Sequence, residues 1–245
     1  MHLVHATLFK LHIAIGAVAL LVFWLPILTR KGSPLHRKAG RVFVICMTTV
    51  AISAMAMSLM VLIDPIGVRV PERNLSFEDA ARLADANRTF NLFLLMLGVL
   101  TFSSLRHGML ALKTKSNPAA LRAPSHRALL ITLGVLGIAV GFVGVQEGAV
   151  LLIVFAVLSV VGSFNSLRDT RIAAMDRKQR LKAHFGGLIG TGVAAYTAFF
   201  AFGGSRLLAD ILTGQWQVLA WITPAIIGTI AIRRVEKRQN QGVTA

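Results

Sequence analysis

The sequence is poor in cysteine and in acidic residues. Its 245 residues include one cysteine, Cys46, and only 10 aspartates and glutamates against 26 lysines and arginines. A single cysteine excludes an intramolecular disulfide and any cysteine-based zinc site. Charged residues make up 15% of the chain, whereas a soluble domain usually carries roughly a quarter. The composition therefore argues against a water-soluble globular protein.

Several chemical signatures are also missing. No aspartate or glutamate lies in the middle of a long apolar run, and Glu147 stands only at the edge of one. Carriers coupled to protons or sodium usually need such a buried carboxylate. The chain has no glycine-rich phosphate loop, no H-E-x-x-H pair and no credible Ser-His-Asp set. Whether the protein is an enzyme stays open at this stage.

Long apolar runs dominate what is present. The chain is 55% apolar, with a mean hydropathy of +0.69. Seven runs are long enough to cross about 30 Å of hydrocarbon as helices. They lie approximately at 8–29, 42–63, 90–112, 128–145, 147–167, 185–203 and 212–232. The first run is longer than the apolar region of a cleaved signal and lacks a small-x-small site, so we expect it to be retained. The sequence predicts an all-α, polytopic transmembrane helix bundle that forms a single integral membrane domain over 1–245.

The basic residues alternate between the two sides of these runs. The loops after the first, third and fifth runs, together with the C-terminal tail, hold 20 of the 26 lysines and arginines. By the positive-inside rule, this alternation predicts a cytoplasmic C-terminus and an N-terminus outside. The formal charge of +16 is then a consequence of topology. We expect contact with the lipid bilayer and its anionic headgroups, and no nucleic-acid partner.

The segment 64–89 is the only sizeable loop expected on the outer side. Ser76 and Asp79 form a capping-box-like start to an amphipathic stretch. We expect a short helix lying on the outer surface, either as a lead-in turn or as a lid over a substrate.

Four histidines are expected at one membrane depth. His36, His126 and His184 open the second, fourth and sixth runs from the cytoplasmic side, and His107 lies about a turn inside the end of the third. Such residues commonly contact lipid phosphates at the interface. Four imidazoles at one depth also match what a metal or haem needs, because axial ligands must face each other across one porphyrin.

The leading hypothesis is a membrane redox protein that binds haem b and exchanges electrons with quinone or another redox partner. His107 and His184 are the preferred metal ligands, His36 and His126 are reserve ligands, and Arg37, Arg41 and Arg127 are candidate partners of the haem propionates. A small-molecule transporter or receptor is the alternative, with a pocket between the first, sixth and seventh runs. A third possibility is a membrane assembly scaffold without a cofactor.

The sixth run carries a stripe of small residues. Gly186, Gly190, Ala194 and Ala198 recur every four positions, which lets two helix backbones approach closely. We expect this face to be a packing seam, although a flat ring could also use it. Tyr196, the only tyrosine, adds a polar group near mid-membrane.

A resemblance extends this interpretation. The sequence has a histidine in the first run, "HR…GR" opening the second, a histidine before a "TAF" helix and "W-x-x-P-x-x-x-G" in the last. It resembles an uncharacterised family of bacterial predicted membrane proteins. The matching residues are His12, His36, Arg37, Gly40, Arg41, His184, Thr197, Ala198, Phe199, Trp221, Pro224 and Gly228. The resemblance implies a multi-pass protein of the bacterial inner (plasma) membrane and no established activity.

Overall fold

The structure is a computed structural model, and it describes residues 1–71, 74–204, 223–224, 226–230 and 232–234. In these residues the chain is helical, with no strand. The elements in order are α1 (His2–Leu28), α2 (Pro34–Ile63), α3 (Pro65–Arg69), α4 (Phe77–Lys113), η1 (Ala120–Arg122), α5 (Pro124–Gln146), α6 (Val150–Asp169), α7 (Arg177–Ala198) and η2 (Phe199–Gly203). The predicted all-α class is confirmed.

Five of these helices are long and apolar enough to cross a membrane: α1, α2, α4, α5 and α6. They match the first five predicted runs. The sixth run falls in α7 and η2, but α7 begins with four basic residues in two turns and is not among the five. Most of the seventh run lies outside the described residues. Seven spans and the orientation of the termini therefore remain predictions.

The helix boundaries follow from local chemistry. The side chains of Ser33, Ser76 and Asp176 each accept a hydrogen bond from a first-turn N–H of α2, α4 and α7. Proline stands in the first turn of α2 and α5, where its missing N–H costs nothing. Between α5 and α6, Gly148 has a φ of +63°, which permits the tight turn that joins these two helices.

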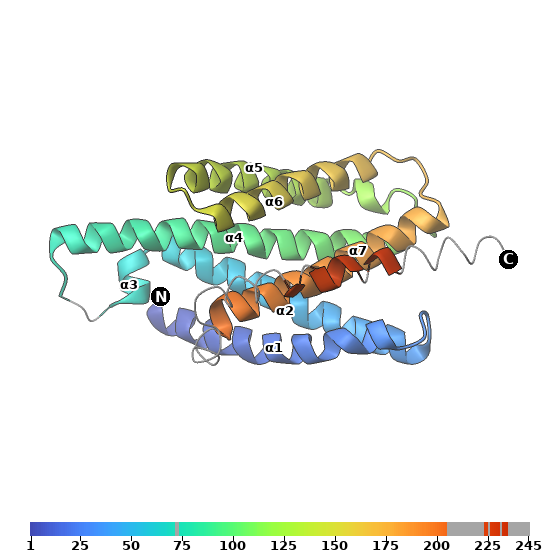
Figure 1. The fold of residues 1–245 in the computed structure, drawn as a ribbon, viewed down its shortest axis with the longest axis horizontal. Coiled ribbons are helices and arrows are strands. Elements are labelled where there is room, and N and C mark those ends of the chain that lie inside the picture. The colour runs from blue at the N-terminus through green and yellow to red at the C-terminus, as the bar shows by residue number, and fades with distance from the viewer. Residues whose placement is uncertain (72–73, 205–222, 225, 231, 235–245) are drawn as a thin grey trace.

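The prediction of a short, separate surface helix in the outer loop is wrong. Ser76 does cap a helix, but that helix is α4 itself, which runs unbroken for 37 residues. No proline or glycine separates Phe77 from Leu97, so nothing ends the helix before the apolar run begins. At 1.5 Å per residue α4 is about 55 Å long. Its first turns extend past the neighbouring helices (Figure 1).

α4 is the central element of the bundle. The α5–α6 hairpin packs on one side of it, and α1, α2 and α7 lie on the other (Figure 1). Each side has an apolar core containing residues of α4. One core comprises Phe93, Met96, Val99, Leu133, Val140 and Ala156, and the other comprises Ala19, Phe23, Phe43, Met47 and Leu105. The loops α1–α2, α4–α5 and α6–α7 share one end of the bundle, at the right in Figure 1. We call it the basic end, because Arg30, Lys31, Lys115, Arg122 and Arg171 lie in these loops.

Among the described residues, the small-residue stripe of α7 makes no close helix contact at Gly186 or Gly190, where the sequence suggested a packing seam. A Cβ added at Gly186 or Gly190 would meet no described atom within 4 Å. The close contacts belong to Gly187 and Gly192. A Cβ at Gly187 would lie 2.6 Å from the Ser104 carbonyl oxygen of α4, and one at Gly192 would collide with the Phe23 ring of α1. Among the described residues, α7 therefore approaches α4 and α1 most closely at Gly187 and Gly192, and not at Gly186 and Gly190.

Candidate functional site

Three ionisable side chains from three helices form a continuous polar chain near the basic end. Nδ1 of His107 lies 3.2 Å from Nε2 of His126, and Nε2 of His107 lies 3.3 Å from Oδ2 of Asp169. The two imidazole rings are tilted by 32° with centroids 5.4 Å apart. His107 is therefore the middle member of a carboxylate–imidazole–imidazole chain.

The helices bring these residues together from distant parts of the sequence. His107 lies in the last two turns of α4, His126 in the first turn of α5, and Asp169 is the last residue of α6. Pro124 fixes the start of α5, so His126 enters the bundle at the level of the α4 end. Because α5 and α6 form an antiparallel hairpin, the end of α6 returns to the same level as the start of α5.

One end of this hydrogen-bonded chain is exposed and the other is buried. We call them the wet end and the dry end. The Asp169 side chain is 29% exposed, whereas His126 has no exposed surface. His107 is buried between them. Nδ1 of His126 is buried and has no hydrogen-bond partner among the described residues. A buried polar atom without a partner is rare and costly, so each one calls for an explanation.

The hydrogen-bond pattern limits the protonation states of the chain. With Asp169 ionised and both rings neutral, His107 donates from Nε2 to the carboxylate and accepts at Nδ1 from Nε2–H of His126. Nδ1 of His126 then carries a lone pair. If a proton enters there and both shared protons shift along their bonds, Asp169 ends up protonated. The same heavy-atom geometry accommodates both states.

Arg106 lies beside the dry end. One terminal nitrogen of its guanidinium donates a 2.9 Å hydrogen bond to Oγ of Ser125, the residue before His126. Its Nε is buried and unpaired among the described residues. Arg106 forms no ion pair with any residue that the structure describes.

The two histidines preferred as haem ligands are engaged separately. His107 uses both ring nitrogens within the polar chain, while Nδ1 of His184 lies 3.3 Å from the Gly108 carbonyl oxygen. Nδ1 of His36 lies 3.0 Å from the Pro26 carbonyl oxygen. The described residues contain no group of three or more histidine, cysteine, aspartate or glutamate side chains that could hold a metal. The three arginines named for the propionates are exposed and form no ion pair with a described residue: Arg37, Arg41 and Arg127.

Sequence reasoning missed Asp169. It follows a long apolar run and stands beside Arg168, so it resembles an ordinary loop residue at the end of a span. Its position at the cytoplasmic end of the fifth run gives it the same expected membrane depth as His107. This shared depth was the sequence signal that could have identified it. Asp169 stands at the end of a run and not in the middle, where a coupled carrier usually has its carboxylate.

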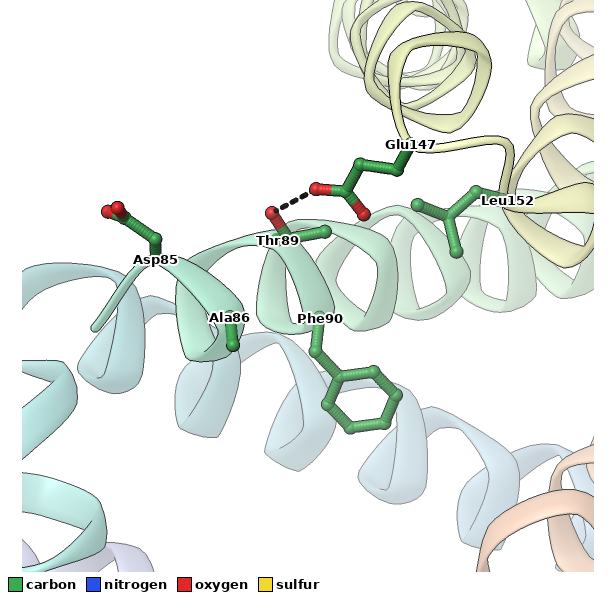
Figure 2. Close-up of a pocket in the computed structure, with 6 residues that line it drawn as sticks. All are labelled: Asp85, Ala86, Thr89, Phe90, Glu147 and Leu152. Carbon is green, nitrogen blue, oxygen red and sulfur yellow. Dashed lines mark hydrogen bonds between the residues drawn. The ribbon is translucent and has the colours of Figure 1, made fainter. Parts of the chain in front are cut away.

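A pocket of about 460 Å³ lies at the other end of the bundle, where α4 meets the α5–α6 hairpin. Asp85, Ala86, Thr89, Phe90, Glu147 and Leu152 line it. Among these lining residues, Thr89 donates a 3.2 Å hydrogen bond to Glu147 (Figure 2). The pocket is separated from the polar chain by the apolar core around Phe93 and Met96.

Comparison with known proteins finds nothing similar to this chain. No family model matches it, and neither a curated protein nor a solved structure does. The resemblance to a bacterial membrane family therefore stays a prediction. What the sequence and structure establish together is an all-helical protein with five helices that are long and apolar enough to cross a membrane.

Proposed function

We propose that the protein is a proton-coupled membrane transporter, in which Asp169, His107 and His126 transfer a proton between water and the interior of the bundle. The observation that carries this proposal is the continuous hydrogen-bonded chain with one exposed and one buried end. Chains of Asp, Glu and His inside membrane proteins are the usual proton relays of pumps and carriers.

The transfer needs no movement of a heavy atom. A proton binds the lone pair on Nδ1 of His126, and the proton on its Nε2 passes to Nδ1 of His107. The proton on Nε2 of His107 then passes to Asp169, which releases it to water. Each ring gains one proton and loses one, so the net result is one proton delivered from Nδ1 of His126 to water. This single transfer leaves each ring in its other tautomer, so both rings must turn over before a second proton follows in the same direction. Uptake reverses these steps.

The basic end faces the cytoplasm in this proposal, in keeping with the positive-inside rule. Asp169 then exchanges protons with the cytoplasm, and the bacterial inner membrane is the proposed location. An apolar core that includes Phe93 and Met96 lies between the relay and the pocket at the opposite end.

Proton flux into liposomes tests this proposal. Purified protein would be reconstituted with a pH-sensitive dye inside, and a potassium diffusion potential would drive protons inward. Asp169→Asn and His107→Gln should each reduce the flux at least about tenfold, because each removes a proton carrier from the chain. Asp85→Asn is the matched control, since Asp85 is an exposed carboxylate at the other end. Flux that survives both relay substitutions would contradict the proposal.

Haem b binding in a membrane electron-transfer protein is the second candidate, now with His36 and His184 as ligands. Each donates its Nδ1 proton to a backbone carbonyl, which leaves Nε2 with the lone pair that iron binds. No described residue hydrogen-bonds either Nε2. The two side chains are close enough for their charges to interact. Quinone or a redox protein would be the electron partner.

An absorption spectrum decides this second candidate. Protein produced with haem supplied should show a Soret band, and His184→Ala and His36→Ala should each lower the haem content. His2→Ala is the control, because His2 lies at the opposite end of the bundle. A colourless wild-type protein would exclude haem binding and leave the proton-coupled transporter as the only proposed function.

A further inference from the structure

The cavity between α4 and the α5–α6 hairpin takes no part in the proton relay. Its volume is about 460 Å³, which is the size of pockets that hold small organic molecules. α4 forms one wall, from Asp85 to Phe90, and the hairpin forms the other, with Glu147 and Leu152. The side chain of Asp85 is 82% exposed, so one wall of the cavity lies at the surface of the bundle.

Glu147 presents an oriented carboxylate to this cavity. One of its oxygens accepts the 3.2 Å hydrogen bond from Thr89, which joins the two walls. Figure 2 shows the other oxygen on the side of Leu152. None of the ion pairs among the described residues involves Glu147. A carboxylate oxygen beside the apolar wall is therefore available to a hydrogen-bond donor.

The second acidic residue of the lining is engaged elsewhere. Asp85 lies 3.8 Å from the guanidinium of Arg88, three residues further along α4. Figure 2 shows the Asp85 side chain directed away from Glu147. The cavity thus offers one inward carboxylate, which matches a ligand with a single positive charge.

The rest of the lining favours a ligand with an apolar body. Ala86, Phe90 and Leu152 are apolar, and the lining that the structure describes contains no lysine, arginine or histidine that would attract an anion. An ammonium group donates strong hydrogen bonds to a carboxylate, and a hydrocarbon body gains from leaving water at the apolar walls. A metal ion needs more ligands than one carboxylate and one hydroxyl.

We propose that this cavity binds an organic cation, an ammonium group carried on an apolar body, with Glu147 as its anionic partner and Thr89 as the residue that positions the carboxylate. The inference rests on the proposed function, because it names the class of substrate that the transporter carries. In that function the basic end faces the cytoplasm, so the cavity at the opposite end receives its ligand from the outer side.

Naphthylmethylamine is the probe for the test, because it is a fluorescent cation at neutral pH, and naphthylmethanol is a neutral analogue of nearly equal size. Equilibrium dialysis measures the binding of each to the purified full-length protein in phosphatidylcholine nanodiscs. Protein-free nanodiscs give the partition into lipid, which is subtracted.

Glu147→Gln should weaken binding of the amine about fivefold or more, because a charge-assisted hydrogen bond is lost, and should leave binding of naphthylmethanol within about twofold. Asp85→Asn is the matched control, since it makes the same carboxylate-to-amide change in the same lining. It should stay within about twofold for the amine, as expected for an exposed charge. Thr89→Val should also weaken binding of the amine, and Thr89→Ser, which keeps the hydroxyl, should restore it.

The outcomes separate the claims. Equal affinity for the amine in Glu147→Gln and Asp85→Asn overturns the role of Glu147. Equal binding of the amine and of naphthylmethanol to the wild-type protein overturns the recognition of charge. Asp169→Asn should leave binding of the amine within about twofold, because Asp169 lies at the opposite end of the bundle. Lost proton flux with intact amine binding would refute the relay and keep the cavity, whereas intact flux without amine binding would refute the cavity and keep the relay.

Discussion

Replacing Gly187 and Gly190 of α7 with alanine compares two nearly identical substitutions with opposite expected effects. Both residues lie in the same helix, so alanine gains the same helix propensity at each, about 0.5–1 kcal/mol. At Gly190 no described atom lies within 4 Å of the new methyl group. At Gly187 the methyl group would lie 2.6 Å from the Ser104 carbonyl oxygen and 3.3 Å from the Gly108 Cα, both backbone atoms of α4.

The steric penalty at Gly187 therefore exceeds the gain in propensity. Overpacking typically costs about 1–3 kcal/mol, and here the contacting atoms cannot rotate away, because they belong to a helix backbone. We expect Gly187→Ala to lower the free energy of unfolding by about 1–2 kcal/mol and Gly190→Ala to raise it by up to about 1 kcal/mol. For a chain of this size, 1 kcal/mol corresponds to a Tm shift of roughly 2–4 °C.

Thermal unfolding in one detergent, followed by circular dichroism, measures both variants. Leucine extends the comparison, because a branched side chain at Gly187 must separate α4 from α7. Gly187→Leu should then lose most of its folded yield, while Gly190→Leu should not. Equal shifts for the two alanine variants would refute the assignment of Gly187 as the contact point and restore the small-residue stripe as the seam.

Three further outcomes are expected. In a Cys46→Ala background, a cysteine at Lys115 should resist an impermeant thiol reagent in intact cells and one at Asn74 should react, which checks the orientation by labelling. Asp176→Ala should lower the free energy of unfolding by about 1 kcal/mol in a denaturation measurement, because it removes the capping box of α7. Ser163→Ala should cost about 0.5–1.5 kcal/mol in the same measurement, because its Oγ donates a buried 2.7 Å hydrogen bond to the Leu130 carbonyl.

The helices and their ends could be predicted because their signals are local. Continuous apolar runs predicted the five helices that can cross a membrane, and Ser76 marks a helix start as expected. The surface helix expected within 64–89 was mispredicted, since amphipathic composition indicates a helix but not whether it bends away from the next one. Only the unbroken backbone of α4 shows that it does not.

The site could be predicted only in part. Position along each run placed His36, His107, His126 and His184 near one end of the bundle, and the structure has them there. Which histidine meets which could not be predicted, because the runs are apolar on every side and mark no single inward face. A helix rotated by one residue turns its side chains by about 100°.

The sequence by itself determined an all-α protein with membrane-length helices, a strongly basic set of loops and four histidines at a shared depth. Tertiary structure alone decided that His107 contacts Asp169 and His126, while His184 turns to the Gly108 carbonyl. It also decided that α7 contacts the backbone of α4 at Gly187 and not at Gly190. The physical reason is the same in both cases. Depth is set by distance along a helix and can be counted in residues, whereas partnership depends on the rotation of each helix about its axis, which packing between helices sets.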